Sequence, residues 1–174
     1  MQNYLFKNIS VVNEGKILNL DVLTNGERIE KIDTQIHVKQ RINEINGEGK
    51  YLLPGVIDDQ VHFREPGLTH KASIHTESRA AVAGGVTSFM EMPNTIPNAL
   101  TLNLLEDKYK IASKSSLANY SFFMGVSNNN SDEVLRTNKF KTSICGVKIF
   151  MGSSTGNMLV NNHATLNRIF SESE

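Results

Sequence analysis

The sequence predicts an α/β fold in which a short β-rich segment precedes strand–helix units that surround a parallel sheet. About the first 50 residues alternate apolar and polar side chains in short runs that end at turn residues, which is typical of strands with one solvated face. After Pro54, short apolar runs recur about every 26 to 33 residues, with helical stretches between them. Strands that alternate with helices in this way indicate βαβ units.

Three strands are expected within residues 1–52, the N-terminal β-rich domain. Residues 5–12 end at Asn13-Glu14-Gly15, residues 17–23 end at Asn25-Gly26, and residues 28–32 follow. Asn-Gly is a favoured dipeptide of tight hairpins because both residues tolerate a positive φ. The segment therefore predicts a small antiparallel sheet with one wet face.

Residues 53–174 are expected to form the second domain. Its predicted strands are residues 55–59, 86–92, 120–126 and 146–151, and its predicted helices are residues 73–83, 102–113, 131–139 and 162–170. A complete eight-unit barrel occupies about 250 residues. Two architectures fit the period: a small open α/β sheet, or the front half of a larger TIM-like barrel, its strands 1–4.

Composition excludes several classes of protein. Of the 174 residues, 39% are apolar and 21% are charged, as in globular proteins. Eighteen basic residues balance eighteen acidic ones, so no net field attracts nucleic acid or an anionic membrane. No apolar run nears the ~18 residues that span a bilayer, the N-terminus lacks a signal-peptide pattern, and a lone cysteine, Cys145, excludes an internal disulfide. We expect a soluble, cytoplasmic protein with no nucleic-acid or membrane partner.

Polar residues gather where the first strand of the second domain ends. Asp58, Gln60, His62 and Arg64 share one face if the strand continues through them. One interpretation is a polar strand end at the rim of the sheet. The other is a functional site, because such folds bind ligands at the carboxyl ends of parallel strands, and His62 is a plausible metal ligand.

Asn94 follows the second strand in Met92-Pro93-Asn94-Thr95-Ile96-Pro97. Two prolines fix the backbone and hold Asn94 on a rigid loop, either as part of a site or as a turn that only caps a helix. Lys148 lies within the apolar fourth strand, where a buried ammonium is costly unless it is paired or neutralised. The alternative for Lys148 is a side chain that extends to the surface near the strand end.

Taken together, five stretches resemble the dihydroorotase family of the amidohydrolase superfamily, over roughly residues 50–160. The matching stretches are Pro54-Gly55-Val56-Ile57-Asp58, Val61-His62-Phe63-Arg64-Glu65-Pro66-Gly67, Ala83-Gly84-Gly85-Val86-Thr87, Met92-Pro93-Asn94-Thr95 and Gly146-Val147-Lys148. The resemblance implies a zinc-dependent cyclic amidohydrolase that interconverts dihydroorotate and carbamoyl aspartate in pyrimidine biosynthesis. It also implies that residues 53–174 form the front half of a TIM-like barrel, and that the early strands form part of a composite β-sandwich.

The resemblance also implies roles for single residues. His62 is similar to a metal ligand, and Lys148 to the lysine that bridges two zinc ions as a carbamate. Arg64 and Asn94 resemble the pair that holds the substrate carboxylate. The resemblance implies two zinc ions. Gln60 stands where the family usually has a histidine, and an amide oxygen is a poor zinc ligand, so a single ion is the alternative expectation. No catalytic residue is assigned within these 174 residues, because the family's catalytic aspartate comes from later strands.

Three other possibilities remain open at this point. Allantoinases and hydantoinases share the barrel and the metal chemistry, although Arg64 with Asn94 favours a substrate that bears a carboxylate. A non-catalytic dihydroorotase-like subunit that binds a partner enzyme would account for Gln60. The sequence is also consistent with an incomplete chain of an active enzyme, which is inactive alone and forms a homo-oligomer when complete.

Overall fold

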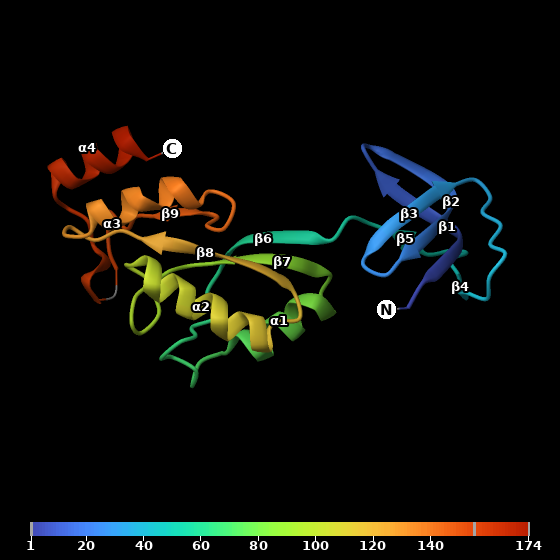
Figure 1. Ribbon diagram of the computed structural model, residues 1–174, viewed down its shortest axis with the longest axis horizontal. Coiled ribbons are helices and arrows are strands. Elements are labelled where there is room, and N and C mark those ends of the chain that lie inside the picture. Colours follow the sequence, from blue (N-terminus) through green and yellow to red (C-terminus); the bar gives the residue numbers. More distant parts are fainter. Residues whose placement is uncertain (1, 155, 174) are drawn as a thin grey trace. The chain divides into compact units, whose positions relative to one another are not determined.

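A computed structural model describes residues 2–154 and 156–173 of the chain (Figure 1). The chain divides into two compact units, residues 1–54 and residues 55–174, and each is described by itself. Within the described residues, no helix has the length and apolar character needed to cross a membrane.

The first unit is a five-stranded sheet. Its strands are β1 (Tyr4–Asn13), β2 (Lys16–Asn25), β3 (Arg28–Asp33), β4 (Asn43–Asn46) and β5 (Tyr51–Leu52). The first three strands are antiparallel neighbours, as the hairpin signals predict, whereas β4 and β5 both pair with β1 in parallel. The expectation of a purely antiparallel sheet is therefore wrong. After β3 the chain crosses to the other side of β1 instead of turning back in a hairpin, and a crossover of this kind produces parallel pairing.

Asp21 anchors the crossover segment to β2. The residue is 1% exposed, and its carboxylate accepts the backbone N–H groups of Asn8 (3.0 Å) and Ile36 (2.9 Å). Lys7 Nζ lies 2.7 Å from Asp21 Oδ2. Since Ile36 lies in the crossover and packs in the small core of this unit, Asp21 holds the segment against the sheet.

The second unit is a four-stranded parallel sheet with helices between the strands, which confirms the predicted α/β class. The strands lie side by side in chain order: β6 (Val56–Val61), β7 (Val86–Glu91), β8 (Asn119–Gly125) and β9 (Gly146–Lys148). The helices are α1 (Ile74–Ala83), α2 (Leu102–Ser115), α3 (Ser131–Leu135), α4 (His163–Glu172) and two short 3-10 helices, η1 (Arg136–Phe140) and η2 (Gly156–Met158).

Capping residues set the helix starts close to where they were predicted. Ser73 forms a capping box with Thr76 at the start of α1, and the Thr101 and Asn162 side chains accept backbone N–H groups at the starts of α2 and α4. The predicted helix over residues 131–139 is instead α3 followed by η1. The predicted strand over residues 146–151 ends at Lys148, because its partner β8 ends at Gly125, which pairs with Lys148.

The core of the second unit lies between the sheet and its helices. α1 packs against β7, and α2 packs against β8. Phe89, Phe122 and Met124 are at most 1% exposed, and Tyr109 of α2 contacts Phe122 edge to face at 4.9 Å between ring centroids. The packed parallel sheet brings the carboxyl ends of β6 and β7 to one edge, where Val61 is in register with Glu91.

Candidate active site

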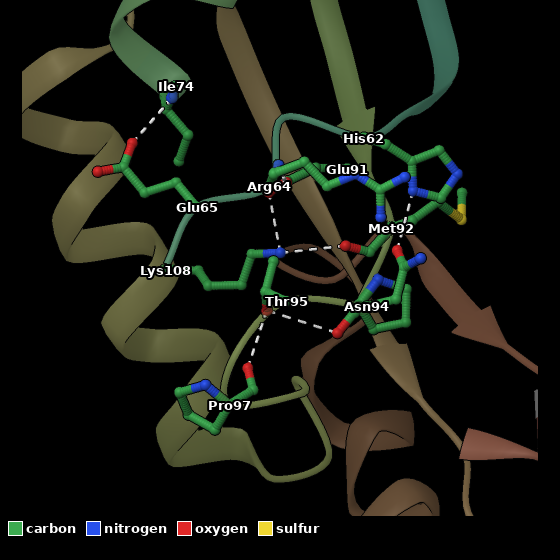
Figure 2. Close-up of polar contacts among 11 residues, drawn as sticks. His62, Arg64, Glu65, Ile74, Glu91, Met92, Asn94, Thr95, Pro97 and Lys108 are labelled. Atoms are coloured by element: carbon green, nitrogen blue, oxygen red, sulfur yellow. Dashed lines mark hydrogen bonds and ion pairs between the residues drawn. The ribbon is translucent and has the colours of Figure 1, made fainter. Parts of the chain in front are cut away.

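The loops that follow β6 and β7 bring His62 and Asn94 together (Figure 2). His62 Nδ1 lies 2.9 Å from Asn94 Oδ1. A carbonyl oxygen only accepts, so Nδ1 carries the proton and donates it. The lone pair of His62 then lies on Nε2, and the amide nitrogen of Asn94 remains as a donor for another group.

The polar residues Asp58, Gln60, His62 and Arg64 do not lie on one continuous strand face. β6 ends at Val61, and its pairing with β7 is irregular between Asp58 and Val61. Arg64 has a φ of 69°, a left-handed conformation that costs a non-glycine residue about 1–2 kcal/mol. The expectation that four residues share a face is therefore wrong, because the strand stops and the chain turns. Gln60 stays on the strand with an exposed side chain, and its backbone N–H donates to Asp58 Oδ1 at 3.1 Å.

An open pocket of about 620 Å3 joins Arg64 and Asn94. It is also lined by a second cation, Lys71, and by the amides of Asn98 and Asn157. Among the described residues that line it, none is acidic. Two cations and several amide donors without a carboxylate favour an anionic ligand. A larger hollow of about 710 Å3, lined by residues of α2, β8 and η1, contains none of the predicted site residues.

Lys148 is half-buried, and its ammonium lies 5.1 Å from the centre of the Phe150 ring. Lys148 is the last residue of β9 and is partly exposed, so it is not the fully buried lysine that one of the two interpretations expected, and its ammonium lies against an aromatic ring. The lysine that is fully buried is Lys108 of α2, with 1% exposure.

Sequence reasoning missed the ion pair of Glu91 and Lys108. Lys108 Nζ lies 2.8 Å from Glu91 Oε2 and donates to the carbonyl oxygen of Met92 at 3.1 Å. Glu91 Oε1 accepts the backbone N–H of Arg64 at 3.0 Å. The available signal was periodicity: Lys108 falls in the buried stripe of α2 with Leu105 and Ala112, at positions where apolar residues are expected.

Burial and neighbouring charges shift the titration of these groups. Partial burial lowers the pKa of the His62 imidazole, and the positive charges of Arg64, Lys148 and Lys108 lower it further, although the Asn94 hydrogen bond opposes them. Burial raises the pKa of Glu91 and lowers the pKa of Lys108, and their mutual attraction only partly offsets it. The imidazole of His62 is therefore biased to the neutral form, which is the form that binds metals.

The donor set is too small to hold a metal ion by itself. Within residues 2–154 and 156–173, no group of three His, Cys, Asp or Glu side chains could hold a metal ion. Structural and catalytic zinc sites in proteins use three or four protein ligands. The described residues therefore supply at most part of a zinc site, and no reaction step is assigned to a metal in this chain.

Comparison with solved structures identifies the fold class. An L-hydantoinase (dihydropyrimidinase) from Arthrobacter aurescens superposes with a TM-score of 0.88 and 26% identity, over 99% of this chain and 38% of that one. A dihydropyrimidinase from Brevibacillus agri NCHU1002 gives a TM-score of 0.76 and 25% identity, over 92% of this chain and 35% of that one. Of the two predicted architectures, the front half of a TIM-like amidohydrolase barrel is confirmed, with a β-rich segment before it.

Comparison of sequences identifies the family. Residues 49–138 match the family model described as dihydro-orotase-like. A dihydroorotase of Carboxydothermus hydrogenoformans is 44% identical over 106 residues, 59% of this chain and 24% of the relative. A dihydroorotase of Methanosarcina acetivorans is 33% identical over 161 residues, 92% of this chain and 34% of the relative. The chain belongs to the dihydro-orotase-like family, and it spans about a quarter to a third of the length of these two relatives.

Proposed function

We propose that this chain provides the first four strand–helix units of a cyclic amidohydrolase that interconverts dihydroorotate and carbamoyl aspartate, a reaction of pyrimidine biosynthesis. The observation that carries the proposal is the cationic pocket lined by Arg64 and Asn94 at the carboxyl ends of β6 and β7. Dihydroorotate carries a carboxylate on its ring, and the fork of an arginine guanidinium matches a carboxylate with two parallel hydrogen bonds.

Asn94 has a double role in this proposal. Its Oδ1 accepts from His62 and so fixes the imidazole, while its amide nitrogen donates to the substrate carboxylate beside Arg64. His62 and the substrate are thereby held by one side chain. A ring bound through its carboxylate presents its amide bond in a defined orientation, which is the contribution these residues make to hydrolysis.

We propose zinc as the metal of the complete site, with two of its ligands from this chain. His62 would bind through Nε2, and Lys148 would bind as a carbamate, formed when its neutral amine adds carbon dioxide and releases a proton. Gln60 is a weak third candidate through its amide oxygen. Zinc, when bound, lowers the pKa of a water molecule and so supplies the nucleophile for amide hydrolysis.

A hydantoinase-type function is the second candidate, because the solved relatives with the same fold are named hydantoinases and dihydropyrimidinases. The two functions differ in the charge of the substrate. Hydantoin and dihydrouracil rings carry no carboxylate, so they would leave the guanidinium of Arg64 unpaired. The dihydroorotase relatives and the carboxylate-free pocket favour the anionic substrate.

We also propose that residues 1–52 are one part of a composite β-sandwich, that residues 53–174 carry barrel strands 1–4, and that the protein acts in the cytoplasm as a homo-oligomer. The exposed apolar side chains Val56 and Ile57 on β6, which are 54% and 62% exposed, are the support for further association at that strand.

The experiment that tests this proposal is a ligand titration in which binding is detected by shifts of the backbone amide NMR resonances. Dihydroorotate, carbamoyl aspartate and uncharged dihydrouracil are each added to the chain, to the Arg64→Ala/Asn94→Ala variant, and to Arg79→Ala, an exposed cation of α1 that serves as control. We expect the two anions to shift the resonances of residues 64 and 94 in the wild type and in the control only. Equal binding of dihydrouracil would favour the hydantoinase-type function, and no binding of either anion would refute the proposed function.

A further inference from the structure

A buried ion pair lies beneath the two loops that carry the candidate site (Figure 2). Glu91 is the last residue of β7 and is 0% exposed, and Lys108 comes from the middle of α2 and is 1% exposed. Their charged atoms lie 2.8 Å apart. The pair therefore joins the strand end to the helix inside the core of the second unit.

Each member of the pair also holds the backbone of a different loop. Glu91 Oε1 accepts the N–H of Arg64 in the loop after β6. Lys108 Nζ donates to the carbonyl of Met92, which begins the loop after β7. One ion pair thus connects the loop of His62 and Arg64 to the loop of Asn94.

Stability alone is a poor explanation for this arrangement. Desolvation of two charges offsets much of their attraction, and well-packed apolar residues in place of a buried pair often leave stability unchanged or improve it. Arg64, by contrast, has a left-handed backbone that persists only where its surroundings impose it. The hydrogen bond from its N–H to Glu91 is such a constraint.

We propose that Glu91 and Lys108 are positioning residues that fix the Arg64 guanidinium relative to the His62–Asn94 pair, and thereby the geometry in which the substrate carboxylate is held. This inference rests on the proposed function for its ligand. The placement of the Arg64 backbone by Glu91 is a property of the fold and is measurable without any ligand.

Two double variants separate positioning from simple charge neutralisation. Glu91→Leu/Lys108→Met removes the charges and every hydrogen bond of the pair. Glu91→Gln/Lys108→Met also removes the charges, but the amide oxygen that it introduces still accepts the Arg64 N–H. Lys110→Met, which removes an exposed lysine of the same helix, is the surface control.

The first measurement is amide hydrogen exchange at Arg64, with the N–H of Ile96, which donates to Pro66 at 3.1 Å, as an internal reference. We expect exchange at Arg64 to rise about tenfold or more in the leucine variant, and dihydroorotate affinity to fall about tenfold or more, because the partly buried N–H of Arg64 loses its acceptor. In the glutamine variant, the Arg64 amide should stay protected while the side-chain resonances of His62 and Asn94 move. Unchanged exchange at Arg64 in the leucine variant would overturn the proposal.

Two other outcomes also test the positioning role of Glu91 and Lys108. If the leucine variant does not fold, the glutamine variant tests the proposal by itself, and unmoved His62 and Asn94 resonances overturn it. If the wild-type chain binds neither dihydroorotate nor carbamoyl aspartate, the proposed function fails, while the difference in Arg64 exchange between the two variants still measures the positioning.

Discussion

The side chains of His62 and Asn94, 32 residues apart in the sequence, lie 2.9 Å apart between Nδ1 and Oδ1. The hydrogen bond links the loops that follow two neighbouring strands. Met92 N–H also donates to the carbonyl of Val61, and Ile96 N–H donates to that of Pro66. The loops therefore form one connected edge of the sheet, on which the imidazole has a defined tautomer.

Asn94→Asp should separate the two roles of Asn94. The new carboxylate still accepts the Nδ1 proton of His62, but it repels the substrate carboxylate. We expect dihydroorotate affinity to fall by about tenfold or more, while the His62 Nδ1 proton stays hydrogen-bonded and its pKa rises beside the negative charge. Calorimetry measures the affinity and nitrogen-15 spectra report the tautomer. Asn103→Asp, on the exposed face of α2, should bind as the wild type does; undiminished affinity in Asn94→Asp contradicts the role given to Asn94.

In the complete, zinc-loaded protein, Lys148 should carry a carbamate. With carbon-13 bicarbonate, the wild type should show a carbamate carbon signal that is lost in Lys148→Ala and in Lys148→Arg, since a guanidinium stays charged and does not add carbon dioxide. The Ala variant should retain less zinc after dialysis, and short carboxylic acids should restore part of it. Lys139→Ala, which removes an exposed lysine, is the control and should keep the carbamate signal. A carbamate signal that persists in Lys148→Ala would show that another amine carries it.

In the complete protein, Gln60→His should increase the zinc that is retained, because imidazole is a much better zinc ligand than an amide oxygen. Metal analysis after dialysis checks this expectation. Gln40→His, which adds an imidazole to the first unit, controls for non-specific binding. Two bound zinc ions in both wild type and Gln60→His would show that Gln60, or a neighbour, already suffices as a ligand.

Asp21 should make the stability of the first unit depend on pH. Burial raises the pKa of Asp21, but the bonds from Lys7 and from the N–H groups of Asn8 and Ile36 outweigh it, so its pKa lies below the ordinary value. A carboxyl with a lowered pKa stabilises the fold above its unfolded pKa, and this contribution is lost as the pH falls through the folded pKa.

Asp21→Asn should therefore lower the free energy of unfolding of the first unit by about 2 kcal/mol at neutral pH, and the difference should shrink below about pH 4. Urea titrations in which the amide NMR resonances of β1 and β2 are monitored measure the free energy of unfolding of this unit alone. Asp33→Asn, an exposed partner of Lys31, should have a much smaller effect. A difference between Asp21→Asn and wild type that does not depend on pH argues against ionised Asp21 as the anchor.

Gly67→Ala should disturb the site loops, whereas Gly85→Ala should not. Both glycines have a positive φ, 84° and 89°, so alanine costs about 1 kcal/mol or more at either position. A Cβ at Gly67 would also overlap the backbone of Ile96, while a Cβ at Gly85 meets open space. We expect Gly67→Ala to be the less stable variant and to shift the Asn94 resonances in spectra of the folded protein. Equal unfolding midpoints and unchanged Asn94 signals would contradict the close approach of the loops.

The elements that sequence predicts well are those with local signals. α1, α2 and α4 begin where Ser73, Thr101 and Asn162 provide side-chain caps, and β6 to β8 are apolar runs of ordinary length. β4 and β5 were not predicted, because strands of four and two residues that pair in parallel with β1 have no hairpin dipeptide to mark them.

In the candidate site, too, the residues with local sequence signals were predicted and those that depend on tertiary packing were not. His62, Arg64 and Asn94 follow predicted strands, so sequence position alone placed them near one edge of the sheet. Sequence position did not indicate their support. Lys108 is visible in sequence only as a charged residue in the apolar stripe of α2, and its partner Glu91 is identified only when α2 packs on the sheet. Sequence left Lys148 open between a buried position and a strand end, and only the observed length of β9 makes it the last, partly exposed residue of that strand.

The Glu91–Lys108 pair also constrains how this sequence can change over time. Substitution of one member alone leaves the other charge unpaired in the core. This lowers the free energy of unfolding by about 3–5 kcal/mol, a large share of the stability of a typical domain. Loss of both members costs far less. Replacement of the pair by apolar residues one substitution at a time therefore passes through a destabilised single variant. We expect residues 91 and 108 to change together in evolution.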